Sequence, residues 1–177
     1  MKRFLTIMAL LVWSVAAFAQ ESQIPQVLEI AQVETDSVFT TYQVFDLPAG
    51  SQHHYFLDVG NLGFGDEIIQ VNIDPLFRLF IPLGDTLAGA RELLETLKDF
   101  YKAKPGSTMQ LTGSLAPAFP GDVFEPVTVT CRKVLLGRSL EFSVEREGYL
   151  RATYVPRADF NSLLTAVKFY CTIHPKE

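Results

Sequence analysis

One pattern occurs twice in this sequence, as Phe80-Ile81-Pro82-Leu83-Gly84-Asp85 and as Tyr154-Val155-Pro156-Arg157-Ala158-Asp159. In each copy an aromatic residue, a β-branched residue, a proline and an aspartate stand at identical spacing. Proline cannot donate to a strand ladder, and aspartate is a favoured N-cap of helices. The pattern therefore predicts two junctions at which a strand gives way to a helix, with caps at Asp85 and Asp159.

Apolar residues follow both junctions at helical spacing. After Asp85 they are Leu87, Ala90, Leu93, Leu94, Leu97 and Tyr101, before Pro105-Gly106 ends the run. After Asp159 they are Phe160, Leu163, Leu164 and Val167. We therefore expect one helix in each half of the chain.

Alternating apolar residues predict four strands before each helix. The expected strands are 40–45, 54–59, 67–73 and 76–81 in the first half, and 109–114, 127–134, 139–145 and 149–155 in the second. This order predicts an α+β fold with antiparallel sheets and two helices. Two arrangements remain open: tandem ββββα units at 38–105 and 106–177, which could share one globular domain, or a single unrepeated sheet.

The N-terminus is typical of a secretory signal peptide. A basic start at Met1-Lys2-Arg3 precedes the apolar run Phe4–Phe18, and Ala17-Phe18-Ala19 predicts cleavage after Ala19. The run is shorter than the roughly twenty residues that span a bilayer, so we expect a secreted or periplasmic protein with no transmembrane segment after cleavage. An uncleaved anchor is the alternative. Residues 20–37 are expected to form a polar lead-in.

The charge balance argues against nucleic acid as a partner. The chain has 15 basic and 20 acidic residues, and loss of residues 1–19 would remove only Lys2 and Arg3. A mildly acidic surface repels phosphate backbones unless its basic residues gather on one face.

Two cysteines, Cys131 and Cys171, follow the predicted cleavage point. Both fall on apolar stripes and are expected to point inward, and export would allow a disulfide between them to persist. The sequence leaves open a disulfide and two separately buried thiols.

The segment His54-Tyr55-Phe56-Leu57-Asp58-Val59-Gly60-Asn61, followed by 63–71, resembles the first part of a Pur repeat, the ββββα unit of the Pur-alpha family. The resemblance implies paired repeats and single-stranded nucleic-acid binding across the sheets. The outward sheet-face positions in the first unit would include His54, Phe56, Asp58, Arg78 and Phe80. Acids and bases nearly cancel on the predicted outward faces, so the resemblance informs the fold more than the function.

We find no motif for catalysis, for a cofactor or for a metal site. His53 and His54 are neighbours in an extended segment, so their side chains point to opposite faces. The sequence thus predicts a non-enzymatic binding or interaction module of the bacterial envelope, with an unknown protein or glycan partner. A small hydrolase with a dispersed site is the alternative, and a pocket joining a titratable pair such as Asp58 and His54 would favour it. An open sheet edge would permit a homodimer.

Overall fold

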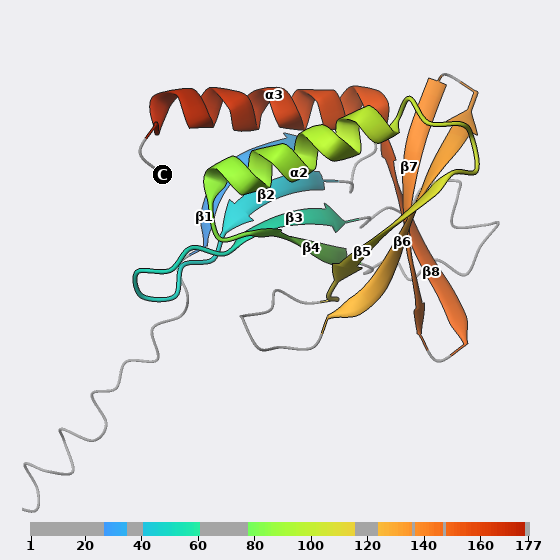
Figure 1. Ribbon diagram of the computed structural model, residues 1–177, viewed down its shortest axis with the longest axis horizontal. Helices are drawn as coiled ribbons and strands as arrows, with labels where there is room; N and C mark the ends of the chain where they lie inside the picture. The colour runs from blue at the N-terminus through green and yellow to red at the C-terminus, as the bar shows by residue number, and fades with distance from the viewer. Residues whose placement is uncertain are drawn as a thin grey trace, which may run out of the picture.

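The computed structural model describes residues 27–34, 41–60, 78–115, 124–135, 137–146 and 148–175. Within these residues the chain forms two antiparallel sheets of four strands, each followed by a helix (Figure 1). The predicted α+β class is confirmed, and the order of elements is that of two tandem ββββα units.

Each sheet is a simple meander in which neighbouring strands follow one another along the chain. The first unit consists of β1 (Leu28–Glu34), β2 (Thr41–Asp46), β3 (Tyr55–Gly60), β4 (Arg78–Gly84) and helix α2 (Leu87–Phe100). The second consists of β5 (Thr108–Gly113), β6 (Glu125–Val134), β7 (Gly137–Arg146), β8 (Tyr149–Pro156) and helix α3 (Arg157–Ile173).

Strand β1 lies inside the segment that we expected to be a lead-in, so the first unit begins before residue 38. The apolar residues of β1 do not alternate regularly, because the pairing of β1 with β2 has a register shift between Glu29 and Ala31. This irregularity leaves two consecutive residues, Ile30 and Ala31, both buried. A bulge of this kind breaks the period of two on which strand prediction depends. The expected strand at 67–73 lies outside the described residues.

The two junctions differ more in structure than in sequence. In the first, β4 continues past Pro82 to Gly84, and the N-cap of α2 is Thr86, whose hydroxyl accepts a hydrogen bond from the Gly89 amide at 3.1 Å. In the second, α3 begins directly after Pro156. The predicted caps at Asp85 and Asp159 are therefore wrong. Asp159 instead lies in the first turn of α3, where a carboxylate complements the helix dipole.

Both helices cover one face of the first sheet (Figure 1). Helix α2 packs on β3 and β4, whereas α3, which belongs to the second unit, packs on β1 and β2. One cluster of buried side chains joins the helices to the inner faces of both sheets. The clean inward set of β7 is as predicted, since Leu140, Phe142 and Val144 are all buried.

Buried polar contacts also connect the two units. The Tyr101 hydroxyl, at the end of α2, donates to the Val155 carbonyl at 2.9 Å, and the Tyr42 hydroxyl donates to the Tyr154 carbonyl at 2.8 Å. Burial raises the pKa of Tyr101, so this hydroxyl remains a donor. The sheets approach closely at Gly113 of β5, where an added Cβ would lie 3.0 Å from the Ile81 side chain and 3.1 Å from the Leu79 side chain, both on β4. The two units therefore share one core.

Both cysteines are free thiols. Of the two arrangements that the sequence left open, the structure therefore has the one without a disulfide. Cys131 is fully buried in the core, as expected. Cys171 is only half-buried, on the side of α3 that packs against the core. Among the described residues, no helix is long and apolar enough to cross a membrane.

Candidate functional site

The turn between β2 and β3 brings a carboxylate and an imidazole together. Leu47 donates its amide to the His54 carbonyl at 2.9 Å, and Ala49 and Gln52 exchange backbone hydrogen bonds at 2.9 and 3.2 Å. Gly50 completes the turn at a φ of 65°, a conformation that glycine adopts without strain. The turn folds residues 53 and 54 back onto the end of β2.

Asp46, the last residue of β2, is the centre of this arrangement. Its Oδ2 lies 2.6 Å from Nδ1 of His53, and its Oδ1 accepts the backbone amide of His54 at 2.9 Å. The Asp46 side chain is 4% exposed, whereas that of His53 is 44% exposed. The His53 ring also stacks on the Tyr55 ring, with centroids 6.0 Å apart. A buried carboxylate thus holds a half-exposed imidazole in one orientation.

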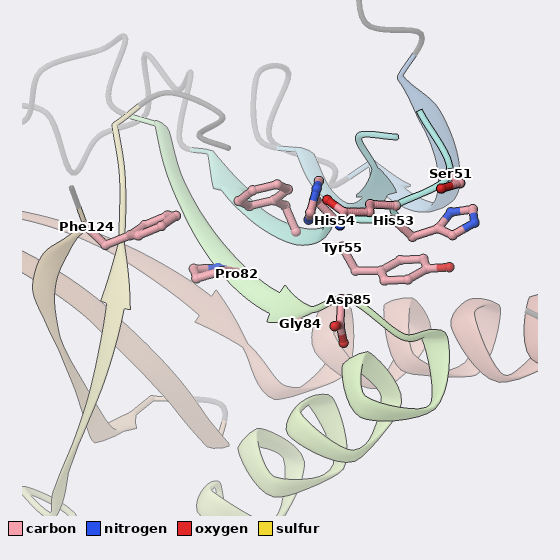
Figure 2. Close-up of a pocket in the computed structure, with 10 residues that line it drawn as sticks. Ser51, His53, His54, Tyr55, Pro82, Gly84, Asp85 and Phe124 are labelled. Carbon is pink, nitrogen blue, oxygen red and sulfur yellow. The ribbon is translucent and has the colours of Figure 1, made fainter. Parts of the chain in front are cut away.

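His53 is one of the residues around an open pocket of about 660 Å³ between the β2–β3 turn and the β4–α2 junction (Figure 2). The pocket is lined by Ser51, Gln52, His53, His54, Tyr55, Phe56, Pro82, Gly84, Asp85 and Phe124. Gly84 has a φ of 106°, so the chain turns there in a conformation that other residues rarely adopt. This turn directs the chain from β4 toward α2 and carries Asp85 to the rim of the pocket.

The buried part of the pocket lining is aromatic, and its exposed rim is polar. Tyr55 and Phe56 are each only 2% exposed and lie beneath the surface, while Phe124 is half-buried. Ser51, Gln52 and Asp85 are exposed at the rim. Among the described residues, the lining contains no lysine or arginine. It therefore offers hydroxyl, amide, imidazole and carboxylate groups around a largely apolar floor.

The contact with Asp46 determines what His53 can do. A carboxylate beside Nδ1 favours the tautomer that carries its proton on that nitrogen, which leaves the lone pair on Nε2. The same contact stabilises the imidazolium once Nε2 takes up a proton. His53 can therefore accept a hydrogen bond or a proton at a fixed position in the pocket wall.

A second carboxylate on the same sheet, Asp58 of β3, forms a different contact. Its side chain is 1% exposed and pairs with the Arg78 guanidinium of β4, which also lies 5.1 Å from the Phe80 ring centroid. Burial raises the pKa of the Asp58 carboxyl above its ordinary value, and Arg78 offsets part of that rise. Neither member of the pair lines the pocket.

The structure separates the five residues that we assigned to the outward sheet face. His54 and Phe56 line the pocket, whereas Asp58, Arg78 and Phe80 lie together farther along β3 and β4. Phe56 and Phe80 are 2% and 4% exposed, within a second apolar cluster that includes Phe45 and Leu47. Their rings do not offer an open face on which a nucleobase could stack.

The titratable pair that we considered from sequence, Asp58 with His54, is not the one at the pocket. The pair there is Asp46 with His53. The turn sequence Pro48-Ala49-Gly50 was the available signal, because a short hairpin places the residues on its two sides next to one another. In the described part of the chain, no group of three metal-ligating side chains comes together.

Comparison of the chain with known protein families, curated proteins and solved structures finds no match. Of the segment that resembles a Pur repeat, residues 55–60 form β3 and 61–71 lie outside the described residues.

Proposed function

We propose that this protein is an exported binding module of the bacterial envelope and that its pocket receives a neutral glycan. The observation that carries the proposal is the pocket of about 660 Å³ whose wall holds His53, oriented by the buried Asp46. A cavity of this size with an apolar floor and a few fixed polar groups is the usual form of a small-ligand site.

The choice of ligand class rests on the chemistry of the lining. A sugar ring has apolar C–H faces that pack on aromatic rings, and hydroxyls that require donors and acceptors around them. Phe124 supplies an accessible ring, and Gln52, His53 and Asp85 supply polar groups. Because the described part of the lining has a carboxylate and no basic side chain, an anionic ligand is disfavoured.

The most direct test is a glycan array probed with the purified wild-type protein, His53→Ala and His174→Ala. His174 is the matched control because it also stacks on a tyrosine, Tyr170, but lies at the end of α3 outside the pocket lining. We expect saturable binding by the wild type and His174→Ala and its loss in His53→Ala. Binding to no glycan, or equal binding by all three proteins, would contradict the proposal.

Export is the second part of the proposal, and it is supported by residues 1–19 alone. Expression of the full chain in a bacterium is expected to give a protein that begins at Gln20 in the envelope fraction. Ala19→Arg, which places a bulky charge at the cleavage position, is expected to block processing. N-terminal sequencing measures both outcomes. Recovery of the unprocessed wild type in the cytosol would contradict export.

The Asp46–His53 contact at 2.6 Å also favours a second candidate function, ester hydrolysis. His53 would accept the proton of the Ser51 hydroxyl, which lines the same pocket, as that oxygen attacks the carbonyl carbon. The ester C–O bond then breaks, the alcohol leaves with that proton, and a water molecule that gives a proton to His53 releases the acid from Ser51. Turnover of an activated ester would then depend equally on both residues. If ester turnover survives Ser51→Ala but not His53→Ala, Ser51 is not the nucleophile and the imidazole of His53 acts only as a base.

A further inference from the structure

The closed end of the β6–β7 hairpin exposes two consecutive apolar side chains. Val134, the last residue of β6, pairs with Gly137 at the start of β7, and Leu135 lies beyond that pair. Leu135 is 99% exposed and Val134 is 41% exposed. Neither side chain belongs to the buried clusters that hold the sheets and helices together. The fold therefore gains little from an apolar side chain at position 135, and its exposure to water is unfavourable.

Two cations lie next to these apolar residues on one face of the hairpin. Lys133 of β6 and Arg138 of β7 stand directly opposite each other, beside the pair formed by Val134 and Gly137. Like charges at directly opposite positions destabilise a strand pair. In the described part of the chain, neither cation forms an ion pair with an acid. A bound anion would relieve this repulsion.

The loop that follows α2 brings further lysines to the same end of the molecule (Figure 1). Gly106 donates its amide to the Cys131 carbonyl at 2.8 Å, and Cys131 donates its amide to the Ser107 carbonyl at 3.0 Å. These two bonds hold the loop beside β6. Lys102 and Lys104 of this loop are exposed, so their charges add to those of the hairpin.

Acidic side chains near this end are already paired with other cations. Asp99 pairs with Lys102 at 2.6 Å, and Glu141 accepts two hydrogen bonds from Arg132, at 3.0 and 2.8 Å. The first turn of α3, residues 157–159, carries one arginine and one aspartate and so adds no net charge. The hairpin and the loop together therefore keep a positive charge.

The rest of the chain has the opposite sign, since the whole chain carries 15 basic and 20 acidic residues. An anionic surface therefore repels most of the molecule and attracts this end. Nucleic acid and lipid bilayers both present phosphates. Residues 132–138 contain no aromatic side chain on which a base could stack, whereas Val134 and Leu135 suit the apolar boundary beneath lipid headgroups. The combination favours a bilayer.

We propose that this basic tip, formed by Lys104, Lys133, Val134, Leu135 and Arg138, binds the surface of an anionic lipid bilayer. The three cations contact headgroup phosphates, and the two apolar side chains enter the boundary between headgroups and acyl chains. The β2–β3 turn and the β4–α2 junction, which border the pocket, lie at the other end of the described structure (Figure 1). Binding through the tip therefore leaves the pocket facing away from the bilayer, and the inference does not depend on the proposed glycan site.

Flotation of the purified protein with lipid vesicles tests the contribution of charge. The vesicles contain phosphatidylcholine alone, or equal parts of phosphatidylcholine and phosphatidylglycerol. Lys133→Gln/Arg138→Gln removes one lysine and one arginine from the tip, and Arg91→Gln/Lys168→Gln removes the same two residue types from exposed positions on α2 and α3. The wild type and the control are expected to prefer the anionic vesicles. The tip variant should bind them about thirtyfold more weakly.

A second pair of variants tests the contribution of the apolar side chains. Leu135→Ser is expected to weaken binding to the anionic vesicles about tenfold, because the leucine no longer enters the bilayer. Leu150→Ser is the matched control. Leu150 is 62% exposed and lies near the β7–β8 turn, at the opposite end of β7 from the tip, so its loss should leave binding unchanged. Circular dichroism verifies that all variants are folded.

The five proteins share one N-terminus, so any vesicle binding through the apolar run 4–18 is common to them. Equal binding of the wild type to neutral and anionic vesicles would overturn the proposal, as would equal losses in the tip and control variants. Unchanged binding by Leu135→Ser would overturn it too, because that result is expected of a purely electrostatic site such as one for nucleic acid.

Discussion

Asp46 and Asp58 are buried carboxylates on neighbouring strands of one sheet. Asp46 is paired with a histidine and Asp58 with an arginine, and the two pairs have different surroundings. The partner of Asp58 is Arg78, whose guanidinium lies beside the Phe80 ring. The partner of Asp46 is His53, which lines an open pocket. Burial of an acid therefore does not by itself mark a functional site. What distinguishes Asp46 is that its titratable partner, His53, belongs to the lining of a pocket.

The largest effect is expected when the Asp58 pair is broken. Arg78→Met keeps the stem of the side chain but leaves the carboxylate buried without its cation. We expect the free energy of unfolding to fall by about 3 kcal/mol, because an uncompensated buried charge is strongly destabilising. Urea unfolding measures the loss. Lys102→Met removes a lysine from an exposed pair with Asp99 and should change stability by less than about 0.5 kcal/mol. Equal losses would mean that Asp58 is not held as the structure shows.

Loss of the Asp46 carboxylate should affect both stability and binding. Asp46→Asn keeps the shape but replaces the charged acceptor of the His54 amide and the partner of the His53 ring. We expect a loss of about 1 to 2 kcal/mol in unfolding free energy. We also expect weaker glycan binding, because the ring is no longer held in one tautomer. Titration calorimetry and urea unfolding of the same preparation separate these effects.

Replacement of His53 should affect binding alone. The glutamine amide can still donate a hydrogen bond to Asp46, which also keeps the His54 amide, so His53→Gln is expected to change stability by less than about 0.5 kcal/mol while glycan affinity falls about tenfold. If Asp46 acts on the ligand only through His53, the double variant Asp46→Asn/His53→Gln should bind the glycan no more weakly than His53→Gln does. Additive losses of affinity would show instead that Asp46 contacts the ligand by another route.

The smallest expected effect is a pH dependence that belongs to Asp58. Because burial raises its pKa in the folded state, the folded protein binds a proton more tightly than the unfolded chain does. This contribution to stability is complete below about pH 4, the ordinary range of an aspartate, and is lost as pH rises through the folded-state pKa. Asp58→Asn should remove that part of the slope in a series of unfolding measurements. An unchanged slope would assign the pH dependence to other groups.

Sequence periodicity predicted the fold class, both helices and the four strands of the second unit. Those strands alternate regularly, as Leu140, Phe142 and Val144 illustrate. It failed at β1, where a register shift buries Ile30 and Ala31 in succession, and at both helix caps. The equal spacing of Pro82 and Pro156 also conceals different junctions, since only the second proline directly precedes its helix.

The site was harder to predict than the fold. His54 and Phe56 were named from alternation along β3, and both do line the pocket. Asp46 and His53 were not paired, because their contact depends on how the turn at 47–52 folds back, which alternation within a strand does not specify. Asp85 reaches the pocket through the positive φ of Gly84, a property that the helix-capping pattern does not encode.

NMR of the histidine rings, during titration with the glycan that binds best on the array, shows whether His53 held by Asp46 forms a glycan site. Saturable shifts of the His53 ring resonances are expected, with no shift of the His174 resonances and loss of the response in Asp46→Asn. Saturable binding that leaves the His53 resonances unmoved would contradict a glycan site at His53.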